Sequence, residues 1–142
     1  GGGEDKRSEV GGDDAIVAVM QAIRFLSYSS ESNRTQFGDL GVCETLSSLI
    51  DLKVEEALEA SASPVGSLAW KVVGAGLTAV SYLSYRHPSN RHKCLSTGLL
   101  QRINSMNRCK LPEKVRSCLQ SAKTMLTVTD APLASAGGKG GG

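Results

Sequence analysis

Apolar residues recur along this chain at steps of three and four, the spacing that places side chains on one face of an α-helix. Ile16, Met20 and Ile23 show the pattern early, and Val72, Leu77 and Leu83 show it in the middle of the sequence. No stretch keeps the alternation of a β-strand for long. The pattern therefore predicts an all-α protein. We expect helices over residues 13–26, 33–40, 42–52 with an extension through 55–60, 64–85, 89–96, 99–106 and 112–126.

Glycine and proline mark the predicted boundaries. Gly41 and Gly98 each separate two apolar segments, and Pro64 and Pro112 stand where helices are expected to begin. Two further glycines, Gly74 and Gly76, lie inside the predicted 64–85 helix, and each costs roughly 1 kcal/mol relative to alanine. We expect a neighbouring helix to approach closely there and so compensate for the cost.

An internal repeat is the most informative feature of the sequence. The segment from Ala22 to Tyr28 matches the segment from Ala79 to Tyr85, which lies 57 residues later. The match continues downstream, with Ser32-Asn33-Arg34 against Ser89-Asn90-Arg91 and Gly41 against Gly98. A shorter third copy starts at Ala122, 43 residues after the second, and we interpret the longer first spacing as an insertion.

These residues resemble the armadillo-repeat family. In the motif Leu-Ser, Asn-Arg, Gly, the Leu-Ser pair would end the third helix of a repeat, as at Leu26-Ser27 and Leu83-Ser84. The resemblance implies an armadillo-like right-handed helical repeat of about two and a half repeats. HEAT-like repeats and an irregular helical bundle remain alternatives. The resemblance also suggests that Asn33 and Asn90 cap helices and that Gly41 and Gly98 adopt a positive φ or allow tight packing.

The resemblance implies a binding surface on the third helices. Family members that bind nuclear-import signals carry a ladder of Asn residues there, with Trp one turn earlier. This chain has Phe25, Tyr82 and Met125 at the Asn position and Gln21, Thr78 and Ser121 at the Trp position, so that mechanism is not supported. An apolar groove would suit a partner helix or peptide better. The expected partner-binding residues are Phe25, Tyr82, Tyr85 and Met125, and the alternative is that Phe25, Tyr82 and Met125 pack in the core.

Charge is distributed unevenly along the chain, although the net charge is only +2. Residues 1–60 hold twelve acidic and five basic residues, whereas residues 61–142 hold two acidic and eleven basic ones. The second hypothesis is therefore a module that binds a phosphoinositide membrane or nucleic acid. Its candidate residues are Arg86, Arg91, Lys93, Arg102 and Arg108. Three interpretations remain. The basic residues form a solvated surface, they bind an acidic partner, or the acidic first half of one copy contacts the basic second half of another in a homodimer.

Residues that could carry out catalysis or bind a metal are few. We therefore expect no enzymatic activity, no cofactor and no bound metal. Four cysteines lack the close pairs of a zinc site, and buried or half-buried free thiols are the expectation. His87 and His92 have no nearby carboxylate to orient them, and an exposed capping or turn role is expected for His87.

Composition completes the predicted organisation. We expect a flexible glycine-rich segment at residues 1–12, a helical domain at 13–130 and a disordered glycine-rich tail at 131–142. The predicted location is the cytoplasm, with the nucleus as the alternative, because the sequence shows no apolar segment typical of secretion or of a membrane span. The chain is interpreted either as a small protein or as part of a longer repeat chain.

Overall fold

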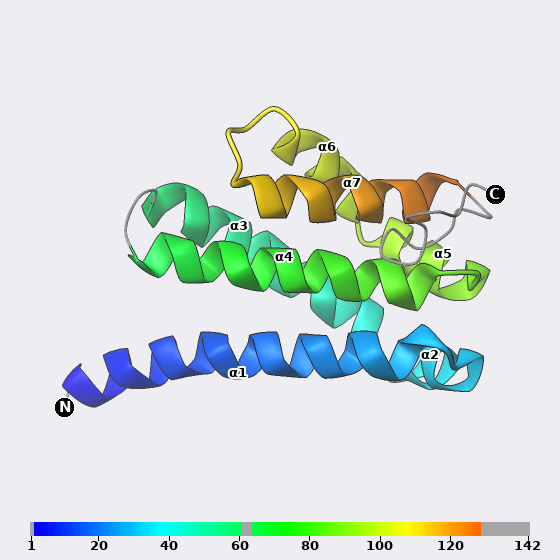
Figure 1. The fold of residues 1–142 in the computed structure, drawn as a ribbon, viewed down its shortest axis with the longest axis horizontal. Coiled ribbons are helices and arrows are strands. Elements are labelled where there is room, and N and C mark those ends of the chain that lie inside the picture. The colour runs from blue at the N-terminus through cyan, green and yellow to red at the C-terminus, as the bar shows by residue number, and fades with distance from the viewer. Residues whose placement is uncertain (1, 61–63, 129–142) are drawn as a thin grey trace.

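The computed structural model describes residues 2–60 and 64–128, and it describes the side chains of residues 12–60 and 66–128. This part of the chain is helical, with no strand, which confirms the all-α prediction. The helices shown in Figure 1 are α1 (Gly2–Tyr28), α2 (Glu31–Asp39), α3 (Val42–Ala60), α4 (Pro64–Ser84), α5 (Pro88–Ser96), α6 (Leu99–Met106) and α7 (Glu113–Thr127).

Most boundaries follow the sequence pattern. Helix α6 has the predicted bounds, and α3 runs without a break through the segment that was expected only as an extension. Helix α1 differs, because it begins at Gly2 and so includes most of the segment expected to be flexible. Asp13, the first residue of the helix expected over residues 13–26, therefore lies within α1. Its carboxylate accepts a 2.7 Å hydrogen bond from Lys53 Nζ on α3.

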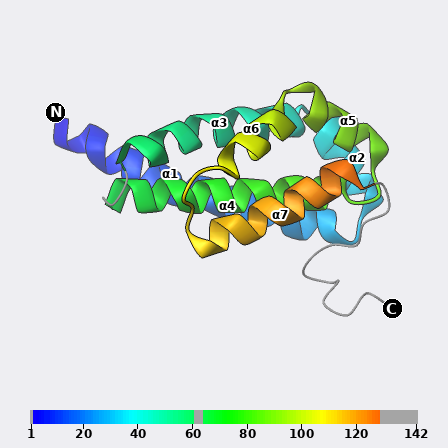
Figure 2. The same cartoon turned by 90° about the horizontal axis from the view of Figure 1, so that it is seen from above.

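Helix α4 lies at the centre of the molecule. It packs against α1 on one side, α7 on the other and α3 along its back, so that α1, α4 and α7 form successive layers (Figure 1). Seen from above, α3 and α6 lie together on one side of α4 and α7 (Figure 2). The short helices α2 and α5 contact each other at one end of the molecule.

One continuous apolar core joins these helices. Its members are buried residues of every helix except α2, and Val72, Leu77 and Leu83 of α4 are among those with no exposed surface. Gly76 shows why a glycine interrupts α4. A Cβ atom there would lie 3.0 Å from Ile50 Cγ1 on α3 and 3.3 Å from Met20 Cε on α1. The expected close approach of neighbouring helices is therefore confirmed at Gly76.

The repeat found in the sequence reappears as repeated backbone geometry. Gly41 and Gly98 precede α3 and α6 with φ angles of +85° and +86°, as predicted, a conformation that suits glycine. Ser30 and His87 then cap α2 and α5, and each accepts a hydrogen bond from the backbone N–H three residues later.

The capping role predicted for Asn33 and Asn90 is wrong. Asn33 Nδ2 donates to the carbonyl oxygen of Leu26 at 2.7 Å, and Asn90 Nδ2 donates to that of Leu83 at 2.9 Å. Each amide therefore satisfies the end of the preceding long helix, where carbonyl groups lack helical partners. The two equivalent bonds show that the matching sequence segments fold in the same way.

Candidate binding groove

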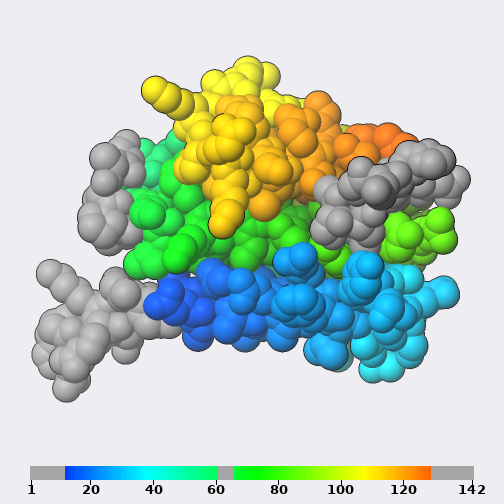
Figure 3. Space-filling view, in the orientation of Figure 1, coloured from blue at the N-terminus to red at the C-terminus, as the bar shows by residue number. Residues whose placement is uncertain are grey.

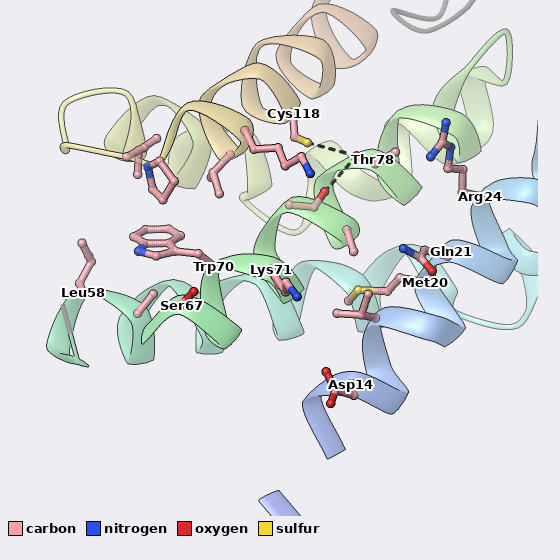
Figure 4. A pocket seen from close by; sticks show the side chains of 18 of the residues that line it. Asp14, Met20, Gln21, Arg24, Leu58, Ser67, Trp70, Lys71, Thr78 and Cys118 are labelled. Carbon is pink, nitrogen blue, oxygen red and sulfur yellow. Dashed lines mark hydrogen bonds between the residues drawn. The ribbon is translucent and has the colours of Figure 1, made fainter. Parts of the chain in front are cut away.

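A groove of about 1050 Å³ lies across α1, α4 and the start of α7, and Figure 4 shows it from close by. Its exposed lining is mainly apolar. The apolar lining comes from these three helices, from the end of α3 and from the segment before α7, and it includes Val17, Leu58, Trp70, Ala75, Leu111 and Val115. The groove therefore depends on the side-by-side packing of helices that are far apart in the sequence.

Residues of equivalent repeat position line the groove. Asp14, Lys71 and Lys114 correspond through the 57- and 43-residue spacings, and all three line it. Gln21 and Thr78 are a second equivalent pair in the lining. The groove is thus a surface that the repeated long helices build together.

Small side chains on α4 leave room for this groove. Trp70, Gly74 and Thr78 follow one another at steps of four, so they form one row along the helix. A Cβ at Gly74 would meet only Cys118 Sγ, at 3.8 Å. Thr78 Oγ1 hydrogen bonds to the Gly74 carbonyl oxygen at 3.0 Å and to Cys118 Sγ at 3.3 Å, as the dashed lines in Figure 4 show.

The charged residues of the lining are mostly basic. Lys71, Lys110 and Lys114 are exposed, and they form no ion pair with any described residue. Arg24 also lines the groove, and its guanidinium lies 4.9 Å from the centre of the Tyr82 ring. Asp14 is the acidic member of the lining. The apolar groove therefore carries a positively charged rim.

Trp70 is the one tryptophan of the chain, and it is half buried in the groove. Figure 4 places its indole toward the end of the groove near Leu58 and Ser67, whereas Thr78 and Arg24 lie toward the other end. Trp70 was not among the residues expected to bind a partner. The signal that could have identified it is the row that a large aromatic residue forms with Gly74 and Thr78.

The expected partner-binding residues lie outside this groove. Tyr82 is 5% exposed and Met125 is 3% exposed, and they pack together with the half-buried Tyr85. For Tyr82 and Met125, core packing, which was the alternative interpretation, is what the structure shows. Phe25 behaves differently, because it is 68% exposed and contacts the Arg24 guanidinium, which lies 5.3 Å from its ring centre. Gln21 and Thr78, one helical turn before Phe25 and Tyr82, do line the groove.

Two of the five candidate anion-binding residues are engaged with carboxylates. Arg102 lies 2.9 Å from Asp51 and 3.1 Å from Glu55, and although burial opposes its charge, these contacts raise its pKa. Lys93 lies 3.7 Å from Asp39. Both contacts join the basic second half of the sequence to the acidic first half, so folding removes part of the charge separation along the chain.

The other candidate anion-binding residues are placed differently. Arg86 and Arg108 are exposed and Arg91 is half buried, and none of them forms an ion pair with a described residue. Arg86 has a positive φ of 46°, and its guanidinium lies 5.3 Å from the centre of the Tyr85 ring.

The four cysteines are free thiols. Cys43 and Cys94 are buried and Cys109 and Cys118 are half buried, as predicted. A hydrogen bond with Cys43 and burial together raise the pKa of Cys94, which therefore stays protonated. No cluster of residues suitable for a metal ion occurs in the described part of the chain.

His87 is buried, not exposed as predicted. Its side chain caps α5 as expected, since Nδ1 accepts a 3.2 Å hydrogen bond from the Asn90 N–H. The proton therefore belongs on Nε2, which is 2.8 Å from Thr35 Oγ1 on α2. Burial and the charge of Arg34 lower the pKa of His87, so the neutral ring is favoured.

No helix in the described ranges is long and apolar enough to cross a membrane. Comparisons with protein-family models, curated proteins and solved structures give no match to this chain.

Proposed function

We propose that this chain is a non-enzymatic, armadillo-like interaction module. Its groove would bind an amphipathic helix or peptide of another protein. The observation that carries the proposal is the apolar groove across α1, α4 and α7 with its basic rim. The equivalent repeat positions in the lining support it, because they make the groove a property of the repeat architecture.

The chemistry of the groove favours a particular kind of partner. Val17, Trp70 and Leu111 offer apolar surface, which suits side chains spaced along one face of a helix. The lysines of the rim, represented by Lys71 and Lys114, favour acidic residues beside that apolar face. The proposed partner therefore presents leucine-like side chains flanked by glutamate or aspartate.

Trp70 provides a direct test, because no other tryptophan contributes to the fluorescence of the chain. We would titrate the protein with a synthetic helical peptide that carries leucines at helical spacing and glutamates beside them. We expect saturable binding with a blue shift of the Trp70 emission, since the indole loses contact with water. A peptide with lysines in place of the glutamates is the matched control and should bind at least about tenfold more weakly.

Charge-reversal variants separate the groove from the other basic residues. Lys71→Glu and Lys114→Glu should weaken binding of the acidic peptide and reduce its dependence on salt. Arg108→Glu is the control, because Arg108 is exposed outside the groove lining. Equal effects of all three changes, or no saturable change in emission, would contradict the proposed groove function.

The same variants address the alternative, an anion-directed module. Vesicles containing phosphoinositide and a short oligonucleotide would be titrated at two salt concentrations. Binding that is lost in Arg108→Glu but kept in Lys71→Glu would favour the alternative over the groove. We expect neither probe to bind in that way, because Lys93 and Arg102 already contact carboxylates.

A further inference from the structure

The outer face of α1 is apolar and exposed. We define it by four positions that recur at steps of four and three: Ala15, Val19, Ala22 and Leu26. All four are exposed, Val19 to 58% and Leu26 to 53%. Helix α1 forms one outer layer of the molecule, along its lower edge in Figure 3. Isolated apolar residues on a surface are common, but a continuous helical face of them typically marks an interaction site.

The internal repeat shows what covers the equivalent faces of the fold. The equivalent positions follow from the 57- and 43-residue spacings, and all eight are buried. They are Val72, Gly76, Ala79 and Leu83 on α4, and Val115, Leu119, Ala122 and Leu126 on α7. Helix α3 covers α4 closely, since a Cβ atom at Gly76 would lie 3.0 Å from Ile50 Cγ1. Helix α6, which precedes α7 as α3 precedes α4, contacts α7.

Helix α3 shows the chemistry of such a covering helix. Its buried apolar residues recur at steps of four and three, at Leu46, Ile50, Val54 and Ala57. Helices α3 and α4 run in opposite directions, with only residues 61–63 between them (Figure 1). Val54, one turn after Ile50 on α3, is therefore level with Val72, one turn before Gly76 on α4.

The outer face of α1 differs from its equivalent on α4 in the sizes of its side chains. Val19 stands at the position of Gly76, and Ala15 stands at the position of Val72. On α4, the missing side chain at Gly76 leaves room for Ile50. On α1 that room is filled by Val19, and space opens one turn earlier at Ala15. A covering helix for α1 therefore needs a small residue against Val19 and a large one a turn later.

The covering helices of this chain are already engaged. Ile50 and Val54 of α3 and Ile103 of α6 are buried in the core of the chain itself. Residues 129–142, which lie outside the described part of the chain, include five glycines and a proline, a composition that disfavours an amphipathic helix. The helix that fits the outer face of α1 therefore comes from elsewhere.

We propose that the outer face of α1 binds an amphipathic helix from outside these 142 residues, antiparallel to α1, in the place that α3 has on α4. The bound helix has an alanine-sized residue against Val19 and a leucine-sized residue one turn later, against Ala15. This site is separate from the groove, because none of the four residues of the outer face lines it.

A synthetic copy of α3, residues 42–60, is the probe, because α3 covers the equivalent face. We would titrate the labelled peptide with the full chain under reducing conditions and follow fluorescence anisotropy. The peptide with Ile50→Ala should bind about tenfold more tightly than the natural α3 sequence, because isoleucine collides with Val19. The peptide with Ile50→Glu is the matched control and should not bind, because its carboxylate would be buried in an apolar contact.

Variants of the full chain test the position and the size rule. Val19→Glu should weaken binding of the Ile50→Ala peptide at least about tenfold. Val19→Gly recreates the surface at Gly76, so it should reverse the preference and favour the natural α3 sequence. Lys71→Glu, at the groove rim, is the control and should bind like the natural chain, with no shift of the Trp70 emission. Circular dichroism would show that every variant keeps its helices.

Four outcomes would overturn the proposal. The first is that neither the natural α3 peptide nor the Ile50→Ala peptide binds the natural chain. The second is that both bind equally and Val19→Gly changes nothing. Binding that Lys71→Glu weakens and Val19→Glu leaves unchanged would place the peptide in the groove. In sedimentation equilibrium without peptide, a dimer that Val19→Glu dissociates would show that a second copy covers this face.

Discussion

At the scale of single residues, the Asn90 side chain links separate helices of the fold. It is fully buried, and its Nδ2 donates to the carbonyl oxygens of Leu83 and Arg34, both at 2.9 Å. One side chain therefore ties the end of α4 to α2 and to the start of α5. The Asn33 side chain makes only one of these two bonds, to the carbonyl oxygen of Leu26, which is equivalent to Leu83. Asn33 is also half exposed.

We expect Asn90→Ala to lower the free energy of unfolding by about 2–3 kcal/mol, because two buried carbonyl groups lose their donor. Asn33→Ala is the matched control, and its loss should be smaller because water can replace the missing donor. Urea unfolding of both variants would measure the difference. Equal losses would contradict the central role assigned to Asn90.

His87 should make stability depend on pH. Its pKa in the folded state lies below the ordinary value of 6.5, owing first to burial and then to the charge of Arg34. As the pH falls below about 6.5, the unfolded chain therefore binds a proton at His87 more readily than the folded chain does. Protonation of Nδ1 would also remove the acceptor for the Asn90 N–H. Stability should fall in this range.

The comparison variant is His87→Asn, because asparagine can still cap a helix but does not titrate. Urea unfolding midpoints measured from pH about 7 to about 5 should depend less on pH in His87→Asn than in the natural chain. His92→Asn, at an exposed position, should keep the natural dependence. If His87→Asn kept the full pH dependence, another group would be responsible.

At the scale of elements, α4 determines how the helices assemble. It carries the repeat register and packs against α1, α3 and α7. Its two interior glycines have different surroundings, although they are only two residues apart. Gly76 faces Ile50 and Met20 closely, whereas Gly74 lies at the more open groove.

These surroundings predict opposite responses to the same substitution. Gly74→Ala should raise the free energy of unfolding by about 0.5–1 kcal/mol, because alanine favours the helix and its Cβ meets no close neighbour. Gly76→Ala should lower it, because the new methyl group forces Ile50 and Met20 to shift. Thermal unfolding would compare the two variants, and a stabilised Gly76→Ala would show that the core around α4 adapts easily.

At the scale of the whole molecule, local patterns predicted the elements better than the site. Steps of three and four indicated the described helices apart from the first part of α1, and Gly41 and Gly98 marked two turns, since these signals depend on neighbouring residues. The groove depends on which faces of α1, α4 and α7 meet. Tyr82, an expected binding residue, lies one helical turn after Thr78, which lines the groove. Contacts such as Arg102 with Asp51 join residues far apart, which a charge count along the sequence cannot reveal.

Helix α1 has one further consequence for the molecule. It is covered mainly along one side, by α4, whereas α4 is enclosed by three helices. Stability is therefore graded across the fold, and α1 can open at lower cost than α4. Because α1 forms one wall of the groove, each opening of α1 also dismantles the site. Any molecule that fills the groove must then slow amide hydrogen exchange throughout α1, so folding of this helix and binding are thermodynamically linked.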